Sequence, residues 1–280
     1  MNIDRARLQS LLQANLNHIA DIRRRSIKVV EDAASQPENA LIPIPFFGNL
    51  AQFENSTRRI LTVGLNPSNR EFQPGKRETK GWLKRFKFDP PINNTERLLQ
   101  ELSHYFQNNP YSWFNSFEQV LRGCDATYGM DSARKNIALH IDVCSPIATV
   151  PTWSELRNAD EKQSKKLLAE KGKIFFLEMI DLFQPDIVIA SVGKSHLEAI
   201  DPIFKPNNLW KVVYSKKTNK NGTPVESENP PKVIGCQLSL QGRQFFFANG
   251  AMRSGPFGVF TNEQKLHIGA QINASSERGN

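Results

Sequence analysis

The sequence predicts an α/β protein: a three-layer sandwich with a central, mainly parallel sheet, preceded by an N-terminal helical extension. Short apolar segments typical of buried strands alternate along the chain with longer segments whose apolar residues recur at helical spacing. Hydrophobic residues make up 39% of the 280 residues, and 18 are Phe, so the chain can bury a large core. These observations exclude a wholly disordered or low-complexity chain.

The expected elements follow one another in a regular order. Helices are expected at 3–34, 95–106, 112–122, 154–183 and 194–200, and strands at 59–64, 137–143, 186–192, 211–214, 233–240 and 243–248. The polar segment 215–232 is expected to be an exposed loop. The predicted organisation is a helical extension over 1–44, an α/β domain over 45–270 and a flexible tail over 271–280.

Charge and cysteine content narrow the class of protein. The formal net charge is +8 and the sequence pI is about 9.4, which favours an anionic partner such as nucleic acid, although a solvated basic surface gives the same balance. No apolar run reaches the about 20 residues of a membrane helix, and the first residues do not resemble a signal peptide. We therefore expect a cytoplasmic protein with no membrane partner. The three cysteines form no CxxC pair, so neither a disulfide framework nor a zinc site is expected.

Ligands of parallel α/β sheets bind at the carboxyl ends of the strands. Four loops with unusual chemistry follow predicted strands, at 64–72, 140–146, 193–196 and 249–257. The first begins Gly64-Leu65-Asn66-Pro67-Ser68, in which a glycine permits close approach of a ligand and an Asn precedes a rigid Pro. An ordinary Asn-Pro turn explains the same residues, but the pattern is neither a P-loop nor GxGxxG.

The segment 64–68 resembles motif 1 of the uracil-DNA glycosylase superfamily, most closely the mismatch-specific and single-strand-selective branches, which have G-[IM]-N-P-G. Four further segments resemble family elements in the same order. They are an aromatic helix at 113–117, a second strand ending in Cys-Ser-Pro at 139–146, a third strand at 186–193 and the leucine-loop motif at 249–254. Together they span roughly residues 45–260.

The resemblance implies a monofunctional DNA glycosylase that flips a base from the duplex, hydrolyses its N-glycosidic bond and needs no metal or organic cofactor. We expect a monomer whose partner is DNA. Asn66 would position the attacking water, Asn249 would assist the leaving base, and Gly64 and Leu65 would line the base pocket.

Gly250 and Ala251 depart from the Pro and Ser of the family motif. The residues that follow would fill the gap left by the base or contact phosphate: Met252, Arg253 and Ser254. Ordinary packing is the alternative for Met252.

The second predicted strand suggests which base is excised. His140 and Asp142 are two residues apart and should share one face of the strand. A carboxylate accepts a hydrogen bond from the N4 amino group of cytosine, whereas uracil-reading members of the family use an Asn there. Ser68 is small where the strictest uracil enzymes have a bulky Tyr. A modified cytosine is therefore expected, with glucosylated hydroxymethylcytosine of bacteriophage DNA as the candidate, in antiviral defence. Uracil or mismatch repair is the alternative, with His140 and Asp142 as structural residues.

Further residues, most of them close to motif 1 in the sequence, could contact the flipped base or the DNA phosphates. Phe72 or Trp82 could stack on the flipped base, although Trp82 is equally typical of a core. Phosphate contacts are expected from basic side chains at Lys76, Arg77, Lys80 and Lys194. A hydrolase with a Ser or Cys nucleophile is disfavoured, because GxSxG is absent. A non-catalytic DNA-binding protein on the same fold stays open as an alternative.

Overall fold

A computed structural model describes residues 2–24, 43–68, 94–107, 110–129, 131–149, 152–205, 207, 209–250 and 255–277. The chain forms two compact units. Unit 1 comprises residues 1–50, 64–110 and 140–183, and unit 2 comprises 51–63, 111–139 and 184–280. Phe72, Trp82, Lys76, Arg77, Lys80, Met252, Arg253 and Ser254 lie outside the described residues.

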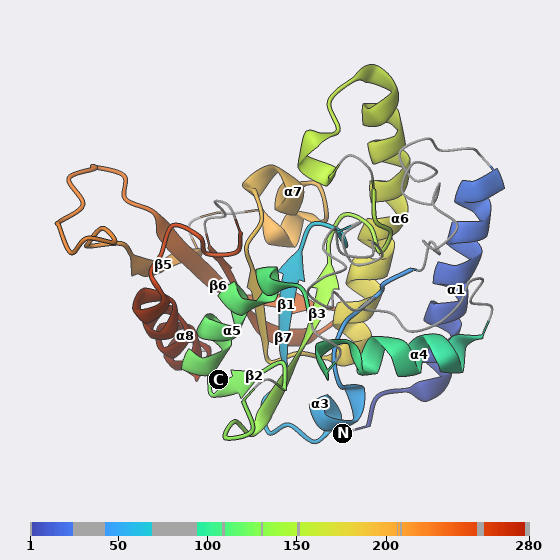
Figure 1. The fold of residues 1–280 in the computed structure, drawn as a ribbon, viewed down its shortest axis with the longest axis horizontal. Helices are drawn as coiled ribbons and strands as arrows, with labels where there is room; N and C mark the ends of the chain where they lie inside the picture. Colours follow the sequence, from blue (N-terminus) through green and yellow to red (C-terminus); the bar gives the residue numbers. More distant parts are fainter. Residues whose placement is uncertain are drawn as a thin grey trace, which may run out of the picture. The chain divides into compact units, whose positions relative to one another are not determined.

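Seven strands form one sheet in the order β2-β3-β1-β4-β7-β6-β5 (Figure 1). The strands are β1 (Ile60–Gly64), β2 (Ala126–Thr127), β3 (Asn136–Asp142), β4 (Ile187–Ala190), β5 (Lys211–Ser215), β6 (Lys232–Leu240) and β7 (Arg243–Gly250). β2 pairs with β3, β1 with β4 and β4 with β7 in parallel, whereas β6 runs antiparallel to both β5 and β7. The α/β class and the mainly parallel sheet are thus confirmed, consistent with a three-layer fold.

The central strands are buried along their whole length. Every residue of β1, β3 and β4 is buried, as expected for parallel strands covered on both faces. Their apolar composition, with β-branched Ile, Val and Thr, explains why these segments form strands. β5, by contrast, is half exposed and lies at one edge of the sheet.

Helix α8 (Asn262–Glu277) corrects one prediction. Residues 271–277 belong to this helix and not to a flexible tail. α8 packs on α5 (Asn115–Gly123), and a Cβ on Gly123 would lie 2.0 Å from the Leu266 carbonyl oxygen, so glycine permits the close crossing. Arg58 also bonds Asn273 and Glu277, which holds the last turns in place.

The long helices in the described part of unit 1 are α1 (Arg5–Arg24), α4 (Thr95–Ser103) and α6 (Ala159–Phe183). α1 packs on α4 and α6, and Arg7 pairs with Glu178 and Asp181 of α6, each at 2.5 Å. The N-terminal helix therefore belongs to the compact unit that includes α4 and α6. The structure describes this helix as far as Arg24, and the rest of the predicted helix, to residue 34, lies outside the described residues.

The remaining helices are short. They are α3 (Leu50–Glu54), η3 (Tyr105–Gln107), η4 (Ser112–Phe114), η5 (Trp153–Glu155), α7 (Lys194–Glu198) and η6 (Pro202–Phe204). α6 begins at Ala159, five residues after the predicted start, because the extended backbone of Leu156 ends η5 and the Asn158 side chain then accepts from the Glu161 amide at 2.8 Å, as a cap for the new helix. Across the described residues, we find no helix with the length and apolarity needed to cross a membrane.

Candidate active site

The candidate site in unit 1 is centred on the carboxyl end of β3. His140 and Asp142 alternate with Ile141, so their side chains point to the same face of the strand, as the sequence predicts. Their side chains are almost fully buried, and Nε2 of His140 lies 3.5 Å from Oδ1 of Asp142. The structure thus brings together the two residues that the sequence analysis assigns to base recognition.

Gly64, the first residue of motif 1, lies directly against this pair. A Cβ at position 64 would be 2.6 Å from Oδ1 of Asp142 and 3.0 Å from Nε2 of His140. Any side chain there would displace both groups, so the glycine is required by a close approach. The motif and the polar pair of β3 therefore belong to one cluster, although 76 residues separate Gly64 from His140 (140 − 64).

The His140 ring packs against Phe47, which also pairs with the backbone of His140. It stacks on Phe47, with ring centroids 6.2 Å apart and an interplanar angle of 26°. The two residues also form an antiparallel bridge, with backbone N–H···O distances of 2.8 and 2.9 Å. A ring fixed in this way keeps Asp142 in one orientation, which is the property that selective recognition needs.

The loop that follows β1 is tied to the segment that follows β3. The Val143 amide donates to the Gly64 carbonyl at 3.0 Å, and the Cys144 amide donates to the Leu65 carbonyl at 2.8 Å. Nδ2 of Asn66 donates to the Ile147 carbonyl at 3.3 Å and lies 3.4 Å from the Thr149 hydroxyl.

These contacts fix how the Asn66 amide is turned. The side chain is half-buried, and its Nδ2 group faces residues 147–149. Its Oδ1 atom therefore points away from them, as a hydrogen-bond acceptor of the kind that can orient a water. Ser68, which forms a bridge with Thr149, closes the described part of the motif.

Asn249 lies in unit 2, at the end of β7, and its environment differs from that of Asn66. Its Oδ1 accepts from the Val192 amide at 3.2 Å, and its Nδ2 donates to the Val192 carbonyl at 3.1 Å. The buried carboxamide thus links β7 to the loop after β4 through a pair of hydrogen bonds, as a backbone peptide group does between paired strands. Sequence reasoning assigned it to leaving-group stabilisation and missed this structural bond.

Gly250 is required by local packing. A Cβ at this position would lie 2.2 Å from Cε1 of Phe257, a fully buried ring in the same unit. The Phe257 amide in turn donates to the Ser191 hydroxyl at 3.1 Å. Lys194, expected to contact phosphate, is exposed at the first turn of α7.

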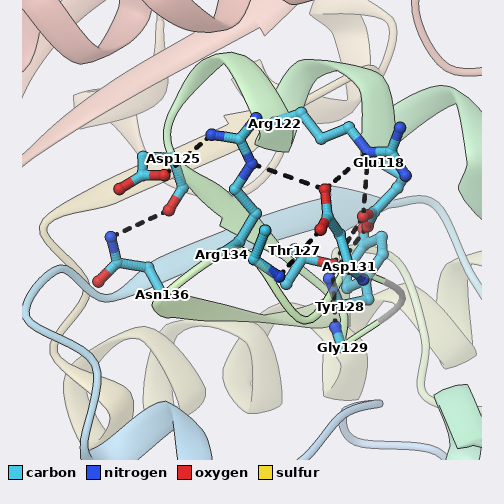
Figure 2. Close-up of polar contacts among 10 residues, drawn as sticks. Glu118, Arg122, Asp125, Thr127, Tyr128, Gly129, Asp131, Arg134 and Asn136 are labelled. Atoms are coloured by element: carbon cyan, nitrogen blue, oxygen red, sulfur yellow. Dashed lines mark hydrogen bonds and ion pairs between the residues drawn. The ribbon is translucent and has the colours of Figure 1, made fainter.

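A polar cluster in unit 2 escaped the sequence analysis (Figure 2). Glu118 of α5 is 3% exposed and accepts from the Thr127 hydroxyl at 2.6 Å and from the Tyr128 amide at 3.0 Å. Arg122 lies 3.7 Å from both Glu118 and Asp131. The one sequence signal for this cluster is a Glu between the apolar residues Phe117 and Val120, on the buried face of an amphipathic helix.

Cysteine chemistry does not contribute to the candidate site. Burial raises the pKa of the Cys124, Cys144 and Cys236 thiols to about 12, so the nucleophilic thiolate is scarce at neutral pH. Within the described ranges, we find no group of three or more His, Cys, Asp or Glu side chains arranged to hold a metal ion.

The chain was also compared with known proteins. No protein-family model matches it, and no curated protein sequence matches it significantly.

Proposed function

We propose that this chain is a monofunctional DNA glycosylase with a fold of the uracil-DNA glycosylase type. The observation that carries the proposal is the close packing of Gly64, at the start of motif 1, against the buried His140–Asp142 pair. A glycine–asparagine loop beside a polar pair at adjacent strand ends is the arrangement that the motif resemblance leads us to expect. It supports a pocket in which a base is read and a water is positioned.

In this proposal Asn66 orients the attacking water. Cleavage of the N-glycosidic bond produces an oxocarbenium-like sugar and an anionic base, so the enzyme must place water below C1′ and stabilise charge. An amide has no useful basicity, and its contribution is therefore orientation. The contacts of Nδ2 with residues 147–149 supply the rigidity that orientation requires.

Asp142 points to a cytosine-like base. Its carboxylate accepts hydrogen bonds, and the N4 amino group distinguishes cytosine from uracil and thymine. Ser68 leaves room for a substituent on C5. We therefore propose a 5-substituted cytosine as the substrate, with glucosylated hydroxymethylcytosine in phage DNA as the candidate and uracil or mismatched bases as the alternative.

One observation favours a second function, that of a non-catalytic DNA-binding protein on this fold. The Asn249 amide is committed to the Val192 backbone through both its oxygen and its nitrogen. An amide held in this way is less available to a leaving base. Turnover by the purified chain separates the two functions.

The test is a glycosylase panel. Single-stranded and duplex DNA containing uracil, a G·T mismatch, hydroxymethylcytosine or its glucosylated form is incubated with the protein, and alkali then cleaves abasic sites. We expect cleavage of modified cytosine and a loss of about 100-fold or more in Asn66→Ala. Asn55→Ala, at an exposed position, serves as the matched control.

Each result of the panel has one meaning. Cleavage confined to uracil would replace the modified-cytosine proposal with a repair function. Binding of DNA without cleavage of any substrate would overturn the glycosylase proposal in favour of the binding protein.

A further inference from the structure

The segment between β5 and β6, residues 216–231, is an ordered arm and not merely a polar loop. Its two limbs are joined by hydrogen bonds from the Lys216 amide to the Pro231 carbonyl at 2.9 Å and from the Val225 amide to the Lys217 carbonyl at 2.9 Å. A bridge between Thr218 and Pro224 closes its tip. In Figure 1 the arm projects from the end of β5 and β6. These backbone hydrogen bonds give the mostly polar segment a defined backbone conformation.

The base of the arm is fastened to the rest of unit 2. Nε2 of Gln264, in the first turn of α8, donates to the Thr218 carbonyl at 3.0 Å. Nζ of Lys216 donates to the Val259 carbonyl at 2.8 Å. Between the arm and the turn at 258–259 lies an open pocket of about 570 Å³, lined by Lys216, Asn219, Lys220, Val225, Pro231, Gly258 and Val259.

This pocket is electropositive. Two of its lining residues are lysines and, within the described residues, none is acidic. Burial lowers the pKa of the nearby Lys265, and the positive charge of Lys220 lowers it further, so like charges act on one another in this region. The carboxylates of the arm, Glu226 and Glu228, lie outside the lining. Gathered ammonium groups are unfavourable unless an anion neutralises them.

We propose that the pocket binds a phosphate group of a nucleic-acid backbone, with Lys220 as the main contact and Lys216 supplying a second charge. The pocket is open and polar and lies at the base of an exposed arm. This shape fits a polymer that continues beyond the pocket better than a small molecule that a pocket would enclose. Lysine contacts of this kind strengthen binding without reading sequence. The choice of DNA as the polymer rests on the proposed function, whereas the phosphate chemistry does not.

The experiment measures how the affinity of the full chain for a fluorescent duplex or single-stranded oligonucleotide falls with KCl concentration. Each neutralised phosphate contributes about 0.9 to the slope of log K against log salt for duplex DNA and about 0.7 for single strands. We expect Lys220→Ala to lower the slope by about one such step. Lys217→Ala is the matched control, because Lys217 is exposed in the same arm but does not line the pocket.

Two outcomes overturn the proposal. One is equal slopes in Lys220→Ala and Lys217→Ala. The other is Lys220-dependent binding of inorganic phosphate or a mononucleotide while the slope for DNA is unchanged, which would assign the pocket to a small ligand. The salt slope does not depend on catalysis. If the protein excised no base but Lys220→Ala still lowered the slope by about one phosphate contact, the phosphate site would stand and the glycosylase proposal would fail.

Discussion

Asp142 and Glu118 are both buried carboxylates, but they are satisfied very differently. Glu118 of unit 2 receives hydrogen bonds from a hydroxyl and a backbone amide and has an arginine 3.7 Å away. Asp142 of unit 1, within the described residues, is held by His140 at 3.5 Å, with the Cα of Gly64 beside it. A carboxylate offers about four acceptor sites, so one that already accepts two hydrogen bonds beside an arginine has less capacity for a ligand than one held by a single long contact.

The difference indicates which buried charge is structural and which is functional. The Glu118 cluster joins α5 to the segment 127–131, and the Tyr128 hydroxyl also bonds Thr62 on β1 (Figure 2 shows the cluster). Burying a charge is costly, and that cost is offset here by specific partners. At Asp142 the partners within the described residues offset less of the cost of burying the charge, which is the pattern of a binding group that is completed by its ligand.

Replacement of Glu118 by Ala tests the structural side and should have the largest effect on stability. The change leaves the Thr127 hydroxyl and the Tyr128 amide without their acceptor, so we expect a loss of about 3 kcal/mol in the free energy of unfolding. Urea denaturation followed by circular dichroism measures it. Glu118→Gln keeps one acceptor and should lose about half as much. A loss below about 1 kcal/mol for Glu118→Ala would show that the cluster is not structural.

Replacement of Asp142 by Asn tests the functional side. We expect excision of a 5-substituted cytosine to fall about 100-fold in kcat/KM, because the N4 amino group loses its charged acceptor. Excision of uracil should rise relative to excision of the 5-substituted cytosine, because the Asn amide can form hydrogen bonds with the uracil edge. Unfolding free energy should change by less than about 1 kcal/mol, and DNA affinity should stay unchanged.

A matched measurement makes this result decisive. Asp142→Ala should lose excision to a similar degree with DNA binding preserved. If Asp142→Ala lost DNA binding and stability as fully as excision, Asp142 would be a structural residue like Glu118, and the contrast between the two would fail.

The strands of the sheet could be predicted, because an apolar strand carries its own local signal. β1, β3, β4 and β7 begin and end within about two residues of the predicted limits. α8 could not, since its buried face includes Lys265, Gly269 and Ser276 beside two isoleucines, and such a face lacks an apolar stripe. Its stability comes from close packing on α5, which no local pattern reveals.

The same distinction applies to the site. The placement of His140 and Asp142 on one face follows from strand geometry and was predictable. The bonding of Asn249 to Val192 was not, because it joins residues 57 positions apart through the pairing of β4 and β7. Motif residues therefore have predictable positions along the chain, but their partners depend on the register of the sheet.

Cys144 gives a smaller and independent test of the charge at Asp142. Burial raises the pKa of Cys144 to about 12, and the negative charge of Asp142 is the second cause of the increase, whereas burial alone raises that of Cys236 to about 12. Asp142→Asn removes the negative charge, so the Cys144 pKa should fall and its thiolate fraction below pH 12 should rise. We expect iodoacetamide labelling of Cys144 at pH 9, followed by mass spectrometry, to be faster in Asp142→Asn than in the parent chain, because the labelling rate follows the thiolate fraction. Labelling of Cys236 in the same sample corrects for global opening. A ratio of Cys144 to Cys236 labelling that is the same in Asp142→Asn and in the parent chain would contradict the prediction, because any acceleration would then come from global opening and not from the loss of a charge beside Cys144.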